Sequence, residues 1–165
     1  QRMNSHIDDI TSNPLWDYSV VVYNLDGVPQ SCLALQDTYG LDVNLLLYGA
    51  WLASAGRRLS HPHLLAVEAA VTDWRNKVVI PLRTLRRQWR SFPLAQALRE
   101  EIKTLELVAE QQQQAMIYVY YQQATELAVS HYPLQENLEL VVKSVTSESD
   151  DWAPEVQRLI ASLSA

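Results

Sequence analysis

The strongest chemical feature of the sequence is a stripe of four arginines. Its members are Arg83, Arg86, Arg87 and Arg90. Residues spaced at i, i+3, i+4 and i+7 lie on one side of a helix. Each guanidinium offers a planar fork of donors that fits the oxygens of phosphates and carboxylates. Arg75 and Lys77 precede the stripe in the same basic segment, so we expect these six side chains to bind an acidic protein, a phosphorylated ligand or nucleic acid.

Charges elsewhere in the chain leave a second interpretation of the stripe open. Four glutamates follow it, namely Glu100, Glu101, Glu106 and Glu110. If their helix folds back along the arginines, ion pairs within the chain neutralise the stripe or leave a solvated face of weak pairs. Residues 57–90 contain eight basic and two acidic side chains, whereas the whole chain has a net charge of −6. Nucleic-acid-binding domains usually carry a net basic footprint, so nucleic acid is the least favoured partner of this acidic protein.

A cluster of polar side chains interrupts an apolar stretch between Cys32 and Ala53. Its members are Gln36, Asp37, Asp42 and Asn44. Two carboxylates with neighbouring amides suit acid–base chemistry or a magnesium ion. A small-molecule pocket is possible near Trp16, Tyr18, Gln36, Asp37 and Asn44. The favoured alternative is a helix junction, in which Gly40 ends one helix and Asp42 caps the next.

Aromatic side chains follow a run of four glutamines near residue 115. They include Tyr118, Tyr120 and Tyr121. Tyrosines with bonded hydroxyls can be part of a core, whereas an exposed aromatic patch marks an interface. Self-association through the helix that carries them is therefore an open possibility.

Motifs for catalysis, metals and cofactors are missing from the sequence. His61 and His63 flank Pro62, but no cysteine or acid lies at the spacing of a metal site. Cys32 is surrounded by apolar residues and is expected to be a small buried hydrophobe. The sequence contains no glycine-rich phosphate loop, no C-x-x-C and no nucleophile elbow. We therefore expect no catalytic residue, no metal and no cofactor.

Helical periodicity, punctuated by prolines and glycines, predicts an all-α fold for this chain of 165 residues. The expected architecture is one helical bundle of about seven helices. A central buried helix is expected near residues 43–55 and one long helix near residues 94–130. Residues 1–13 are expected to form a flexible tail, residues 14–147 the all-α domain, and residues 148–165 a linker with a short helix that packs on the domain or detaches from it.

Three positions carry specific expectations about these helices. Gly49 lies inside the central helix, where it costs about 1 kcal/mol relative to alanine, so a close helix–helix crossing is expected there. Ser60 is expected to cap the helix that contains Pro62 near its start. Pro81 is expected to kink or restart the helix that follows.

Several short motifs along the chain resemble a family of uncharacterised bacterial proteins of about this length. The motifs are P-x-W-x-Y from Pro14, C-x-x-L-Q-D from Cys32, G-x-D-V-N-L-L-L from Gly40, and W-R…P-L-R-x-L-R from Trp74. The resemblance spans roughly residues 14–107. It implies a bacterial, cytoplasmic, α-helical protein, and it brings no catalytic residues because the family has no established activity.

The sequence as a whole favours a non-enzymatic interaction, adaptor or regulatory protein that presents the arginine stripe to an acidic or phosphorylated protein. A small-molecule-binding protein or enzyme is the alternative, and nucleic-acid binding is a weaker one. No apolar run reaches the roughly 18 residues of a membrane-spanning helix, and residues 1–13 carry no segment like the core of a signal peptide. A cytoplasmic location without membrane contact is expected.

Overall fold

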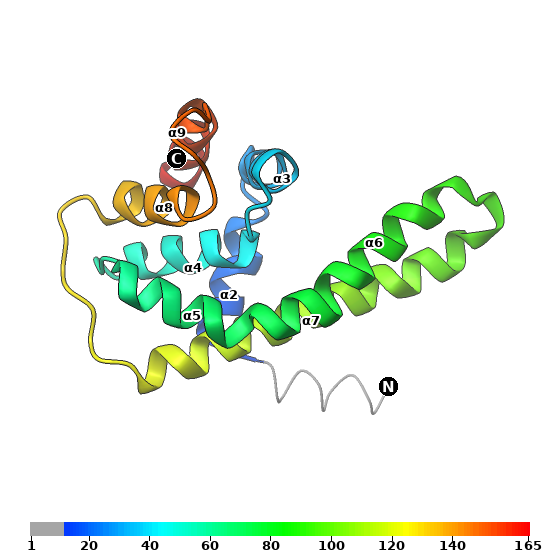
Figure 1. The fold of residues 1–165 in the computed structure, drawn as a ribbon, viewed down its shortest axis with the longest axis horizontal. Coiled ribbons are helices and arrows are strands. Elements are labelled where there is room, and N and C mark those ends of the chain that lie inside the picture. The colour runs from blue at the N-terminus through cyan, green and yellow to red at the C-terminus, as the bar shows by residue number, and fades with distance from the viewer. Residues whose placement is uncertain (1–11) are drawn as a thin grey trace. The chain divides into compact units, whose positions relative to one another are not determined.

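The computed structural model describes residues 12–165, and their regular structure is almost entirely helical (Figure 1). The described residues contain one isolated backbone bridge, between Arg57 and Val129, in place of a sheet. α5 (His61–Trp74), a π-helical turn and α6 (Ile80–Gln88) follow one another without a break and count as one helical segment. Residues 12–165 therefore contain seven continuous helical segments. The predicted all-α fold of about seven helices is confirmed. Most of the predicted N-terminal tail, residues 1–11, lies outside the described residues.

The described chain divides into two compact units. One unit contains residues 66–123, and the other is built from residues 14–65 and 124–165. α5 begins in the second unit and continues into the first. Each unit is described by itself below.

The unit built from residues 14–65 and 124–165 is centred on α4 (Val43–Ser54), as predicted for a buried helix near residues 43–55. Eight of the 12 residues of α4 are buried. Three helices pack against it, namely α2 (Pro14–Val22), α3 (Val28–Tyr39) and α8 (Pro133–Lys143). Burial of each large apolar side chain of α4 stabilises the fold by about 1.5–3 kcal/mol.

α4 packs against α8 (Figure 1). Gly49 lies at this contact, beside Asn137 of α8. A Cβ atom on Gly49 would stand 3.4 Å from the Cβ atom of Asn137, and the Gly49 carbonyl accepts a 2.9 Å hydrogen bond from the Asn137 amide. A Cβ atom at position 49 would therefore already be in van der Waals contact with α8, which leaves no room there for a long side chain. The predicted close crossing at Gly49 is confirmed.

The C-terminal helix α9 (Ala153–Ser164) packs on α3 and α8. Gly27, immediately before α3, has φ 87°, and a Cβ atom there would lie 2.6 Å from the Oγ atom of Ser162. Only glycine combines this backbone conformation with so close a contact. In the structure, therefore, the C-terminal helix lies against its own unit instead of detaching from it.

The segment that joins α7 (Gln96–Gln123) to α8 is extended, which corrects one helix boundary. The predicted long helix near 94–130 ends at Gln123. Beyond it, the amide of Arg58 donates to the carbonyl of Ala128 and the amide of Ser130 donates to the carbonyl of Gly56, at 2.8 and 3.1 Å. Backbone groups that pair with residues 56–58 are unavailable for helical hydrogen bonds, so the helix stops earlier than its apolar pattern indicates.

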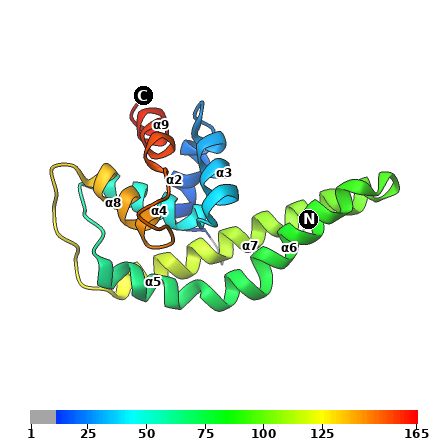
Figure 2. The same cartoon turned by 45° about the horizontal axis from the view of Figure 1, so that its top comes forward.

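The unit of residues 66–123 contains an antiparallel hairpin of α6 and α7 (Figures 1 and 2). Two 3-10 turns, Trp89–Ser91 and Pro93–Ala95, join the helices at the tip. The π-helical turn Arg75–Val79 precedes α6. Because Pro81 has no amide hydrogen and its ring crowds the preceding turn, a widened turn lets the chain remain helical. The helix is therefore continuous through this region and does not restart at Pro81, and the kink expected there stays a prediction.

Candidate interaction surface on the α6–α7 hairpin

The two helices of the hairpin meet along a mixed seam of apolar and charged side chains. On α6 and the turns that flank it, the seam consists of Val79, Leu82, Arg86 and Trp89. On α7 and the turn before it, the seam consists of Ala95, Ile102, Glu106 and Ala109. All eight residues are buried or half-buried. Successive members are three, four or seven residues apart, as expected for one face of each helix. The seam divides the rest of the hairpin surface into two flanks.

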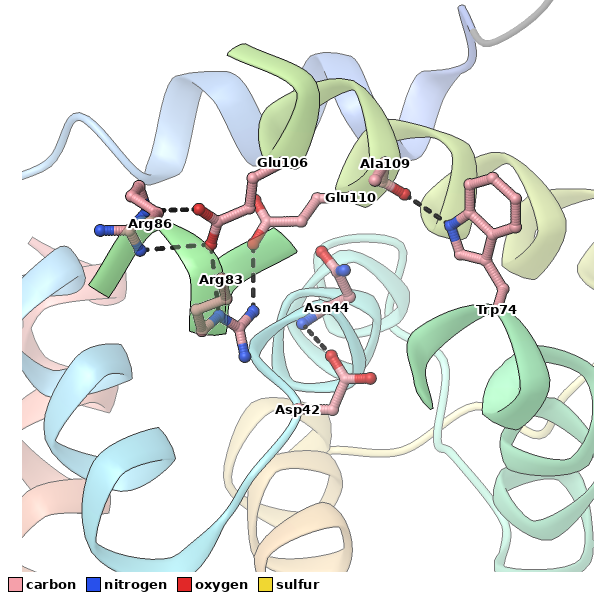
Figure 3. A network of polar contacts seen from close by, with 8 residues as sticks. All are labelled: Asp42, Asn44, Trp74, Arg83, Arg86, Glu106, Ala109 and Glu110. Carbon is pink, nitrogen blue, oxygen red and sulfur yellow. Dashed lines mark hydrogen bonds and ion pairs between the residues drawn. The ribbon is translucent and has the colours of Figure 1, made fainter. Parts of the chain in front are cut away.

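Glu106 is the centre of an ion-pair cluster that ties the helices together (Figure 3). Its side chain is only 8 % exposed. One carboxylate oxygen accepts from Nε of Arg83 at 3.3 Å and from Nη2 of Arg86 at 3.2 Å, and the other accepts from Nε of Arg86. Glu110 adds a hydrogen bond from Nη2 of Arg83 at 3.2 Å. Two of the four arginines therefore point into the hairpin.

The electrostatics of this cluster favour the charged form of Arg86. The hydrogen bond to Glu106 raises the pKa of Arg86. Partial burial lowers this pKa, but the negative charges of Glu106 and Glu110 raise it further. Nearby, the indole of Trp74 donates a 2.8 Å hydrogen bond to the carbonyl of Ala109 (Figure 3). These bonds fix the register of α7 against the preceding helical segments.

The other cations of the hairpin have different surroundings. Arg87 and Arg90 are exposed, as is Lys103 on α7. Arg99 is half-buried and donates from Nε to the carbonyl of Arg86 at 3.2 Å. Arg87, Arg90 and Lys103 therefore remain in contact with solvent near the tip of the hairpin. Lys103 did not enter the sequence prediction because it lies on the helix that supplies the glutamates.

Positions around each helix show which side chains share a flank. Arg83 and Glu110 lie on the same side of the seam, since they pair across it. Helical spacing places Arg87 and Arg90 on this side of α6 and Lys103 on this side of α7. We call the surface formed by Arg83, Arg87, Arg90 and Lys103 the basic flank.

Arg75 and Lys77, the remaining predicted anion-binding residues, lie in the π-helical turn. Nη1 of Arg75 donates to Glu68 at 3.1 Å, and Nζ of Lys77 lies 3.4 Å from a carboxylate oxygen of Asp73. Both cations therefore have an acidic neighbour one or two helical turns earlier. Their positions at the base of the hairpin separate them in sequence and in structure from its tip.

The alternative cluster near Gln36 contains a helix cap. Asp42 accepts a 2.9 Å hydrogen bond from the amide of Asn44 (Figure 3). The amide of Gly40 donates to the carbonyl of Gln36. Both contacts are those of a junction between α3 and α4, which confirms Asp42 as the N-cap residue. Asp37 lies on α3.

Trp16 and Tyr18 of the predicted pocket lie on α2, which packs against α4. Burial raises the pKa of the Tyr18 hydroxyl. The three helices that carry the five pocket residues thus belong to one unit. The small-molecule pocket itself stays a prediction.

The tyrosines predicted as an interface lie in the last part of α7. Tyr118, Tyr120 and Tyr121 are all partly buried, and the rings of Tyr118 and Tyr121 have centroids 6.0 Å apart. Val119, between them, is 50 % exposed. An interface at these tyrosines also stays a prediction.

Cys32 is fully buried, and burial raises the pKa of its thiol to about 12. The thiolate required of a nucleophile is therefore disfavoured at neutral pH, as expected for a core residue. Within residues 12–165, no group of three or more histidine, cysteine or acidic side chains is placed to hold a metal ion. Among the same residues, no helix has the length and apolar character needed to cross a membrane.

The two histidines near the start of α5 have separate roles. The amide of His63 donates to Oγ of Ser60 at 3.3 Å, which confirms the predicted cap. The His63 ring is buried and shares a 2.7 Å hydrogen bond, through Nε2, with the hydroxyl of Tyr48. His61 is exposed. One histidine is therefore part of the core of its unit.

The buried ring makes stability depend on pH. Burial lowers the pKa of His63 from its ordinary value of 6.5, so between the two values the unfolded chain binds more protons than the folded chain. We expect the free energy of unfolding to fall as the pH drops below about 6.5. Urea denaturation between about pH 5 and pH 8 measures this, and His63→Gln should flatten the dependence while His61→Gln should not. An equal slope in the wild-type and His63→Gln proteins would contradict the assignment.

The fold and this surface define an all-α protein whose most developed polar feature is an ion-paired helical hairpin. The chain belongs to the family described as "Protein of unknown function (DUF2390)", whose family model matches residues 14–117. This match confirms the resemblance to an uncharacterised family and includes Arg83, Arg86 and Glu106. No curated protein matches the chain, and no solved structure matches it either.

Proposed function

We propose that the protein is a non-enzymatic interaction module that binds an acidic or phosphorylated partner through the basic flank of the α6–α7 hairpin. The observation that carries this proposal is the division of the arginine stripe. Glu106 holds Arg83 and Arg86 in the hairpin, while Arg87 and Arg90 are exposed. The internal pairs supply a stiff support, so a partner meets cations on a preformed helix and not on a mobile loop.

The size of the flank favours a short acidic segment over nucleic acid. Only three of its cations, Arg87, Arg90 and Lys103, are exposed, and exposed Glu100 lies nearby on α7. Proteins that bind DNA strongly neutralise roughly 6–10 phosphates. A carboxylate or phosphate group can instead be gripped by one or two guanidiniums through charge-assisted hydrogen bonds. A phosphorylated or glutamate-rich protein segment is the partner of matching size.

Replacing Arg87 and Arg90 by serine is expected to weaken binding of such a segment about tenfold or more, since each lost charge-assisted hydrogen bond contributes about 1.5–3 kcal/mol. The measurement is fluorescence anisotropy with a labelled glutamate-rich peptide and its phosphoserine-containing counterpart. Affinity should also fall as salt is raised, because exposed charges are screened.

A matched control removes two exposed cations from the other unit. Arg58→Ser with Lys143→Ser changes the net charge equally and should leave peptide binding unchanged. An equal loss of peptide affinity in both double variants would show that overall charge causes the effect, and it would contradict binding at the basic flank. Tighter binding of a single-stranded oligonucleotide than of either peptide, again dependent on Arg87 and Arg90, would support the nucleic-acid alternative instead.

A further inference from the structure

The flank of the hairpin opposite the basic flank is apolar and open to solvent. Its side chains are Leu85, Leu94, Leu98 and Leu105, with exposed fractions of 36 %, 101 %, 51 % and 52 %. Leu85 lies on α6, and the others lie on α7 or in the turn before it. We call this surface the leucine face.

Helix geometry places these leucines together. In an antiparallel pair, residues on matching sides of the seam share a flank, and the pairing of Arg83 with Glu110 defines the basic one. Leu85 lies on the other side of α6 from Arg83, and Leu98 and Leu105 lie on the other side of α7 from Glu110. The leucines therefore form one continuous surface, not scattered exposed residues.

The spacing along α7 and the turn before it is that of a coiled-coil seam. Leu94 in that turn and Leu98, Glu101, Leu105 and Val108 on α7 follow one another in alternate steps of four and three residues. This register is additional to the one that faces α6 through Ile102, Glu106 and Ala109. Because α7 has two such seams, its second seam stays available for another helix after the first has packed against α6.

We propose that a second copy of this chain docks on the leucine face, so that two hairpins form a four-helix bundle about a two-fold axis. The border of the face supports a copy as the occupant. Pro81 and Gln88 form this border, and the seam itself holds Val108 and a single charged residue, Glu101. Such a border gives little to attract a partner of opposite charge and little to repel an identical surface, as a self-complementary interface requires.

The area of the face amounts to a part of what a dimer interface needs. Judged from their exposed fractions, the four leucines offer several hundred Å² of apolar surface, which is comparable with the largest patch of roughly 300–600 Å² on a typical monomer. The bordering side chains would supply the remainder of the roughly 800 Å² that one partner contributes to a standard interface. Packing two hairpins through heptad seams is the usual geometry of four-helix bundles.

Dimerisation through the leucine face leaves the basic flank exposed, because the two surfaces lie on opposite sides of the seam. A dimer therefore carries two basic flanks, which would strengthen binding to a partner with repeated acidic segments. The dimer itself does not depend on the proposed function. Loss of peptide binding in the Arg87 and Arg90 variant and loss of the dimer are separate results.

The test compares leucines of equal exposure on opposite flanks of α7. The double variant Leu98→Glu and Leu105→Glu places charges in the leucine face, whereas Leu107→Glu introduces a charge at a residue that is 53 % exposed and lies on the other side of the helix. Sedimentation equilibrium of the full chain between about 1 and 100 µM gives the mass of each. We expect a dimer for the wild type and for Leu107→Glu, and a dissociation constant raised more than about 100-fold for the double variant.

A wild-type protein that stays monomeric over this range overturns the proposal whatever the variants do. An unchanged dimer in the double variant also overturns it and moves the interface elsewhere, for example to Tyr118, Tyr120 and Tyr121. Circular dichroism checks that helix content is equal in all proteins. Since the replaced leucines are half-exposed in the single chain, the fold is expected to tolerate the charges. A wild-type monomer that floats with anionic vesicles would assign the face to a lipid surface instead.

Discussion

Replacement of Asn137 by alanine is expected to lower the free energy of unfolding of its unit by roughly 3–5 kcal/mol. The side chain is fully buried, and it makes three hydrogen bonds. Its amide donates to the carbonyls of Gly49 and Arg57, both at 2.9 Å, and its carbonyl accepts from the amide of Leu59 at 2.7 Å. Alanine leaves three buried backbone groups without these partners, and each such loss costs about 1–3 kcal/mol.

Urea denaturation and hydrogen exchange of the α4 and α8 amides measure this effect. Gln135→Ala is the matched control, because Gln135 lies on the same helix and is exposed. Its hydrogen bond to Glu139 lies at the surface, so its loss should change stability by less than about 0.5 kcal/mol. Similar losses in the two variants would show that the buried network of Asn137 contributes little.

Asn137 also shows which contacts the sequence conceals. It lies between Glu136 and Leu138 in an ordinary amphipathic helix, and its partners are 78, 80 and 88 residues away along the chain. No periodicity or motif connects them. Asp42 and Ser60 were predictable as caps because each bonds an amide two or three residues later, where local rules suffice.

The arginine stripe was predictable as a helix face, but its division was not. Spacing places Arg83 and Arg87 on one side of a helix, whereas the tertiary contact decides which of them turns inward. That contact depends on the two short turns at the tip, which set the register of α7 and bring Glu106 rather than Glu100 to the arginines. The sequence was compatible with an arginine stripe covered by glutamates and with one open to solvent. In the structure Arg83 and Arg86 pair with Glu106, whereas Arg87 and Arg90 are exposed.

The early end of α7 has a similar cause. Residues 124–130 continue an apolar pattern after Gln123, so helical periodicity extends the helix too far. Their backbone pairs with residues 56–58, and a pairing over about 70 residues leaves no local trace beyond the β-branched Thr125 and Val129. The helical fold and the central place of α4 could be predicted from composition and spacing. The end of α7 could not, because long-range hydrogen bonds determine it.

Replacement of Glu106 by alanine is expected to have the largest effect on the hairpin, lowering its stability by roughly 2–4 kcal/mol. The carboxylate is almost buried, and it accepts hydrogen bonds from both Arg83 and Arg86. Removal of the acid leaves two guanidiniums with side chains only 19 % and 22 % exposed and without their shared partner. The expected loss is below that of a fully buried pair because water still reaches the arginines.

Glu110→Ala tests whether burial, and not charge alone, causes the loss. Glu110 is 29 % exposed and pairs with Arg83 across the same seam, so its removal should cost less than about 1 kcal/mol. Hydrogen exchange of the α6 and α7 amides separates the hairpin from the rest of the chain, and protection should fall mainly in Glu106→Ala. Equal effects of the two substitutions would contradict a buried cluster. Recovery of protection when Glu106, Arg83 and Arg86 are all replaced by methionine would show that the cost arises from unpaired arginines, because well-packed apolar side chains substitute for buried ion pairs without loss.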